Sequence, residues 1–123
     1  MTPPRAAEYL DQMIEAAQLA HSYVVDMNVE QFMADRRTQQ AVVLNIVVIG
    51  EAASRLVREQ PGFADAHPPV PWRNIRGMRN RVAHGYFDID MALVWQTVSG
   101  SLPQLIDELV RIRAELDPRE PAQ

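Results

Sequence analysis

The segment Ala41–Val57, AVVLNIVVIGEAASRLV, decides whether this chain is built from helices or from strands. Taken alone, its β-branched stretch Val42–Ile49 would suit a buried strand as well as a buried helix. The apolar spacing continues at helical intervals through Leu56 and Val57, however, and the whole run is longer than an ordinary strand. We therefore expect one helix over about 36–60, with its middle apolar on nearly all sides and buried at the centre of the fold.

The rest of the chain repeats this helical spacing. Apolar residues recur every three or four positions along Tyr9–Met27, and again along Leu105–Leu116. Asp90 can cap a further helix, which Gly100–Pro103 should break or kink, and Ser101 can cap the resumed helix. No segment alternates in the manner of a half-buried strand. The expected fold is an all-α, largely antiparallel bundle of four to five helices of the kind found in helical-bundle domains.

Turn-forming residues separate the expected helices. Asn28–Asp35 should contain a short turn, and Pro61–Gly62 should end the central helix, with a loop continuing to Pro71. Phe87–Asp90 is expected to be a connector. The polar tail from about 117 is expected to be disordered.

The bulk composition narrows the classes of protein. The 123 residues are expected to form a single domain, 1–123, and the absence of cysteine excludes a disulfide framework and a thiolate metal site. The N-terminal residues show no apolar signal segment, and the longest apolar run is about half a membrane span. We therefore expect a cytoplasmic protein that does not associate with membranes. The net charge of −4 argues against a general nucleic-acid coat but permits a local basic site.

The stretch that is richest in reactive groups is Trp72–Tyr86, WRNIRGMRNRVAHGY, which holds four arginines, two asparagines, a histidine and a tyrosine. Pro71 suits a first helical turn, and Gly85 suits the end of a helix. One side of this helix is apolar and should face the core: Ile75, Met78 and Val82. The opposite side is polar: Arg73, Gly77, Asn80, Arg81 and His84. Asn80 and His84 are four residues apart, so their side chains can meet.

Arg79 does not fit this division into two sides. It precedes His84 by five residues, which places the two positions about 140° apart around an ideal helix. Either the helix unwinds before His84, or a second copy of the chain brings an arginine to this histidine. Glu51 is a second exception, because it directly follows the most apolar part of the central helix. A buried carboxylate needs a partner, so we expect it to pair with an arginine of Trp72–Tyr86, unless it simply points outward.

The motifs of several common active sites are missing. There is no glycine-rich phosphate loop, no HExxH or comparable metal pattern, and no GxSxG nucleophile signature. What remains is a histidine and an arginine with a neighbouring asparagine and tyrosine, the minimum for metal-free RNA cleavage. Histidine can move protons near neutral pH, and the arginine fork can bind phosphate oxygens. One histidine cannot comfortably serve both proton transfers, so a symmetric dimer would help. This spacing is more often that of a helix-end histidine among solvated arginines, with Tyr86 merely packing.

At these residues the chain resembles a family. Arg79, His84 and Tyr86 match the R-x4-H-x-Y signature of the HepT-like branch of the HEPN proteins, and Asn80 matches the polar residue that often follows the arginine there. The similarity covers nearly the whole chain. Its longest stretches are FMADRRTQQAVVLNIVVIGEAASRL, PWRNIRGMRNRVAHGYFDIDMALVW and SGSLPQL.

The resemblance implies a HEPN-type helical homodimer that acts as a metal-independent endoribonuclease toxin and needs no cofactor. It implies an antitoxin partner, a nucleotidyltransferase of the MntA type that transfers AMP from ATP to Tyr86. By position, Arg79 and His84 are implied to be catalytic and Asn80 to support them. The arginines expected to contact RNA phosphates are Arg73, Arg76 and Arg81. Two competing hypotheses are an inactive HEPN protein, serving as a nucleotide-binding or scaffold partner of the transferase, and a purely structural helical dimer.

Overall fold

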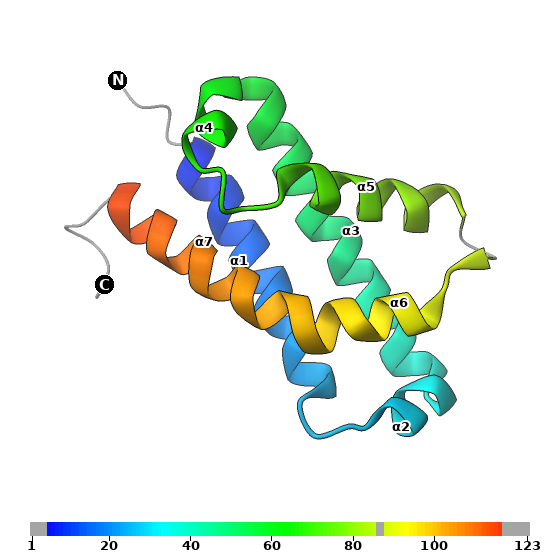
Figure 1. Ribbon diagram of the computed structural model, residues 1–123. Coiled ribbons are helices and arrows are strands. Elements are labelled where there is room, and N and C mark those ends of the chain that lie inside the picture. The colour runs from blue at the N-terminus through cyan, green and yellow to red at the C-terminus, as the bar shows by residue number, and fades with distance from the viewer. Residues whose placement is uncertain (1–4, 86–87, 117–123) are drawn as a thin grey trace.

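The computed structural model describes residues 5–85 and 88–116, with the backbone but not the side chain of His84. Over these residues every regular element is helical, which confirms the all-α class (Figure 1). The helices in chain order are α1 (Arg5–Val24), α2 (Val29–Ala34), α3 (Arg36–Glu59), α4 (Pro61–Ala66), α5 (Trp72–His84), α6 (Met91–Gln96) and α7 (Leu102–Leu116). The π-helical segment Thr97–Ser101 joins α6 to α7.

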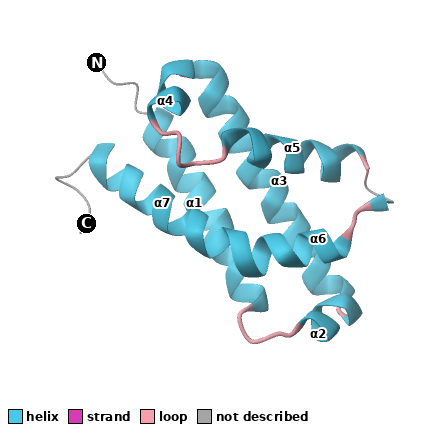
Figure 2. Cartoon of the chain, viewed as in Figure 1, coloured by secondary structure: helices cyan, strands magenta, loops and turns pink. Residues whose placement is uncertain are grey.

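Helix α3 is the centre of the bundle, as predicted, with α1 and α5 packed against it and α7 packed against α1. Figure 2 shows α3 running through the molecule, with the short loops at its periphery. The expected burial of its middle is confirmed only in part, because Leu44 is 63% exposed and Val48 is 38% exposed. The neighbouring helices cover only part of the circumference of α3. By length and composition alone α3 could cross a membrane, a test that the core helix of a soluble protein also passes.

Two connections that were expected to be a turn and a loop contain short helices. The side chain of Asn28 accepts a hydrogen bond from the Gln31 backbone, and the Gln31 side chain accepts one from the Asn28 backbone, so α2 begins with a capping box. Helix α4 begins at Pro61, whose fixed φ suits a first helical position. The capping box of α2 and the proline at the start of α4 therefore favour helices in two segments that are too short to show an apolar period.

Of the break or kink expected at Gly100–Pro103, the break is absent. The helix continues from α6 into α7 through one wider π turn, in which the Leu102 N–H donates to the Thr97 carbonyl. A proline ring inside an α-helix clashes with the carbonyl four residues earlier, and the wider turn lies directly before Pro103. Ser101 therefore lies within a continuous helix and does not cap a new one. The predicted cap at Asp90 is confirmed, since its carboxylate accepts from the N–H groups of Ala92 and Leu93.

Candidate active site on helix α5

The start of α5 is fixed by the segment that precedes it. The Trp72 indole N–H donates to the His67 carbonyl at 3.1 Å, and the ring of Phe63 lies between those of His67 and Trp72, with centroid separations of 4.5 and 6.3 Å. His67, which carried no predicted role, therefore helps to hold the beginning of the basic helix. Trp72 is itself buried in the core.

The predicted apolar side of α5 is confirmed, because Val82 is buried and Ile75 and Met78 pack partly buried against the core. The helical backbone runs through His84, and the Gly85 N–H donates to the Arg81 carbonyl at 2.8 Å. The helix therefore does not unwind before His84, and that alternative is wrong. Positions 79 and 84 stay about 140° apart around one helix axis.

Helices α3 and α5 are in close contact where Arg79 crosses Gly50. A Cβ atom added to Gly50 would lie 2.1 Å from the Cβ and 2.6 Å from the Cγ of Arg79, well inside van der Waals contact. The carbonyl of Ile75 would be 3.3 Å away. Only glycine at position 50 leaves room for the aliphatic stem of Arg79. Gly50 therefore determines where this side chain packs against α3.

The guanidinium of Arg79 is held by two acceptors. Its Nη2 donates to Glu51 Oε1 at 2.7 Å, and its Nη1 donates to Asn80 Oδ1 at 2.9 Å. The predicted pairing of Glu51 with an arginine of this helix is thus confirmed, and the outward-pointing alternative is wrong. Glu51 also faces Arg55, one turn further along α3, with 3.7 Å between Oε2 and the Arg55 Nε. One carboxylate therefore serves two guanidinium groups, and the cluster keeps a positive charge.

Arg79 carries an unusual cost. Its Nε–H is buried and has no acceptor within the described part of the chain, and an unpaired buried donor costs about 1–3 kcal/mol. The side chain as a whole is 29% exposed, so its outer end reaches solvent. Each terminal nitrogen bears two hydrogens, and on each of them one has no acceptor among the residues that the structure describes. The arginine is thus fixed and still able to bind an anion.

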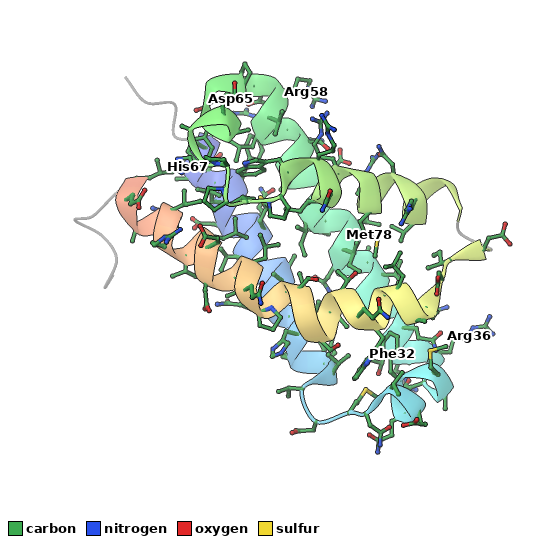
Figure 3. All side chains as sticks on the ribbon, viewed as in Figure 1. Phe32, Arg36, Arg58, Asp65, His67 and Met78 are labelled. Carbon is green, nitrogen blue, oxygen red and sulfur yellow. The ribbon has the colours of Figure 1, made fainter. Side chains whose placement is uncertain are left out.

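The other flank of α5 is open. Between α5 and the α6–α7 helix lies a groove of about 540 Å³, which has Ile49, Met78 and Leu105 in its lining. Arg73 and Arg81 also line it, and both are exposed. Figure 3 shows Met78 extending from α5 into the space between α5 and α6. This groove places a basic rim beside an apolar floor.

The structure thus brings some of the predicted site residues together and separates others. Arg79 and Asn80 are in contact, Arg73 and Arg81 share the groove, and Arg76 is exposed with no hydrogen-bond or ion-pair partner among the described residues. The side chain of His84 and the whole of Tyr86 lie outside the described residues, so the predicted meeting of Asn80 with His84 stays a prediction. The described residues contain no cluster of three histidine, aspartate or glutamate side chains suited to a metal ion.

The sequence reasoning missed Gly50 and Arg55. The signal for Gly50 was present, because an isolated glycine within an apolar helix lowers helix stability and usually has a packing reason. Its position directly before Glu51 could have indicated the crossing point of the two helices. Arg55 could have been found as the residue four positions after Glu51 on the same helix.

Comparison with known proteins assigns the chain to a family. A family model described as "Ribonuclease HepT-like" matches residues 13–112. The chain belongs to the HepT-like family. A protein of Thermococcus cleftensis named "Probable ribonuclease HepT" is 32% identical over 86% of this chain and 94% of its own length. A protein of Caldanaerobacter subterraneus subsp. tengcongensis named as a "Putative RNase" is 30% identical over 91% of this chain and 96% of its own length. No solved structure matches the chain.

Proposed function

We propose that this protein is a metal-independent endoribonuclease and the toxin of a toxin–antitoxin pair, acting in the cytoplasm as a homodimer. The observation that carries the proposal is the state of Arg79, which is fixed by Gly50, Glu51 and Asn80 and keeps terminal N–H groups for an anion. The HepT-like family match and the ribonuclease names of the relatives support the choice of RNA as the substrate.

The proposed chemistry is the attack of an RNA 2′-hydroxyl on the adjacent phosphorus. The 2′-oxygen loses a proton and forms a bond to phosphorus, while the bond to the 5′-oxygen breaks and that oxygen gains a proton. His84 moves protons at this step. Arg79 binds the phosphoryl oxygens, whose negative charge grows in the transition state. Arg73, Arg76 and Arg81 bind flanking phosphates, because they are exposed cations on the same helix.

A dimer reconciles the separation of Arg79 from His84. The two positions lie on different sides of one regular helix, so a two-fold axis beside α5 can place the histidine of one protomer near the arginine of the other. The exposed apolar residues Leu44 and Val48 lie on α3, about two turns and one turn before Glu51, respectively. They give the flank that carries Arg79 an apolar surface for a second copy.

Purified protein tests the ribonuclease directly. RNA should be cleaved in the presence of EDTA, and His84→Ala should abolish cleavage while the far-UV circular dichroism spectrum stays that of a helical protein. His21→Ala, which removes a histidine near the end of α1, is a control for the loss of a histidine outside the site. No cleavage of any RNA by the wild type, or full cleavage by His84→Ala, would reject the proposal.

We further propose that an MntA-type nucleotidyltransferase silences the toxin by transferring AMP to the Tyr86 hydroxyl. The tyrosine oxygen attacks the α-phosphorus of ATP, pyrophosphate leaves, and the hydroxyl proton passes to solvent. The adenylate phosphate lies two residues beyond His84 in the sequence, where a nearby arginine can bind it in place of an RNA phosphate. Tyr86→Phe should retain cleavage and escape silencing by transferase and ATP, whereas the wild type gains one AMP by mass spectrometry. Adenylate on another residue, or equal silencing of both proteins, contradicts this mechanism.

One observation favours a second candidate, an inactive HEPN protein that serves as scaffold for the transferase. Arg79 is already paired with Glu51 across α3 and α5, as an arginine with only a structural role would be. The two functions differ in the cleavage assay: a scaffold binds the transferase but leaves RNA intact, and its His84→Ala variant behaves as the wild type does.

A further inference from the structure

We infer that Glu51 is a positioning residue for the cleavage reaction, and that with Gly50 it fixes the guanidinium of Arg79 in the orientation that binds the reacting phosphate. The inference rests on the proposed ribonuclease function. Gly50 and Glu51 lie on α3, outside the R-x4-H-x-Y motif of α5, so this role is additional to those of the motif residues. The names of the relatives state only a ribonuclease.

Gly50 constrains the stem of Arg79 sterically. The missing side chain at Gly50 lets the Cβ and Cγ of Arg79 occupy space that any other residue would fill. The stem therefore crosses α3 at a single place and emerges beside Glu51, the next residue. A long arginine side chain has several rotatable bonds, and closing its stem against a helix backbone removes most of that freedom before substrate arrives.

Only the two terminal nitrogens of Arg79 take part in its hydrogen bonds with the described residues. Glu51 engages only one N–H of the Arg79 Nη2, and Asn80 engages one of Nη1. A side-by-side ion pair through Nε and Nη would fill the arginine fork, but here the buried Nε–H is left without an acceptor among the described residues. One hydrogen on each terminal nitrogen has no acceptor among the described residues and stays available for a phosphate. In this arrangement the Nε–H makes no hydrogen bond with the described residues, and the two terminal nitrogens can still donate to a phosphate.

The cluster of Glu51, Arg55 and Arg79 carries a net positive charge. A carboxylate paired with a single arginine would neutralise the cation that the transition state needs. Glu51 instead faces both Arg55 and Arg79, at 3.7 and 2.7 Å, so two cations share one anion. The pair orients Arg79 and the cluster still attracts phosphate.

The decisive experiment is a kinetic double-mutant cycle between positions 51 and 79, performed on the full-length protein with a short RNA. Glu51→Ala should lower kcat by about 10²-fold, the loss typical of a misplacement near 1 Å, and should change KM much less. Glu51→Gln keeps an acceptor oxygen for Nη2 and should recover most of that loss. In the Arg79→Ala background, Glu51→Ala should have no further effect, because Glu51 acts through Arg79.

Gly50→Ala tests the steric half. The added methyl must displace the Arg79 stem, so kcat should fall as in Glu51→Ala. Gly62→Ala is the matched control, since a Cβ there meets no atom within 4 Å. If Gly50→Ala fails to fold, the Glu51 variants still decide the matter.

The outcomes separate this inference from the proposed function. Wild-type cleavage by Arg79→Ala would overturn the proposed role of Arg79 itself. An inactive Arg79→Ala beside a fully active Glu51→Ala would overturn the inference alone. A Glu51→Ala variant that cleaves faster than wild type, or one whose effect persists undiminished without Arg79, would also overturn it, because Glu51 would then mask Arg79 or act independently.

Discussion

The two flanks of α5 differ in how they treat arginine. On one flank Arg79 is pressed against Gly50, tied to Glu51 and Asn80, and largely covered. On the other flank Arg73 and Arg81 line an open groove, and the structure gives them no ion pair with the described residues. A fixed cation has lost its conformational freedom before substrate binds, whereas a solvated one loses it on binding. The closed flank is therefore suited to chemistry and the open flank to attraction of RNA.

Removal of the fixed cation should give the largest effect. Arg79→Ala should lower the single-turnover cleavage rate by about 10²–10³-fold, the cost of losing one transition-state donor. Arg79→Lys should not restore it, because an ammonium cannot pair with Glu51 and also present a planar fork to phosphate. Glu51 is 42% exposed and can be hydrated once its partner is gone, so thermal unfolding should remain cooperative. If Arg79→Ala unfolds instead, the ion pair is mainly structural.

The apolar surface beside the closed flank should control assembly. Leu44→Glu should shift the sedimentation of the protein from dimer to monomer at micromolar concentration, and cleavage should fall with it, because a buried unpaired carboxylate in an interface is costly. Leu19→Glu, which alters a 42% exposed leucine on α1, is the control for a new charge elsewhere. If the wild type or Leu44→Glu is a fully active monomer, a single chain completes the site.

The open flank should give smaller and salt-dependent effects. Arg81→Ala should raise KM several-fold with little change in kcat, because a solvated arginine contributes to binding more than to the transition state. Loss of one phosphate contact to single-stranded RNA should also flatten the plot of log affinity against log salt by about 0.7. Arg36→Ala, an exposed arginine at the start of α3 near α2 (Figure 3), is the control. An unchanged salt slope for Arg81→Ala would remove this residue from the RNA surface.

The ion pair of the closed flank and the arginines of the open flank were predictable from sequence, whereas the helix crossing and the groove were not. The predicted ion pair followed from a general rule, since a carboxylate beside an apolar stretch needs a cation, and the basic helix was the nearest source. The identity of the partner, Arg79, depends on how α5 crosses α3 at Gly50. Hydrophobic periodicity within one helix does not predict how two distant segments cross. The groove arises because α5 packs mainly on α3, and hydrophobic spacing predicts which side of a helix is covered but not by how many neighbours.

The helix boundaries show the same limit. The long helix α3 was predicted to within about a residue, because its apolar period extends over many turns. The short helices α2 and α4 were missed, since one or two turns cannot establish a period and their formation depends on capping at Asn28 and on Pro61. A break or kink was expected at Gly100–Pro103 because proline usually ends or kinks a helix, and here one π turn at Thr97–Ser101 precedes Pro103 without a break.

The smallest expected effect lies at the contact between Arg79 and Asn80, the next residue on α5. Asn80 accepts one hydrogen bond from the Arg79 Nη1 at 2.9 Å, and this bond is exposed. A hydrogen bond of this kind contributes about 0.5–1.5 kcal/mol, so Asn80→Ala should lower kcat by roughly 2- to 10-fold. If Asn80 acts through Arg79, the pH dependence of the rate should keep its shape and the effect should vanish in the Arg79→Ala background. A shifted pH profile would instead indicate that Asn80 orients the imidazole of His84, four residues further along α5, and would assign it to the proton-transfer half of the site.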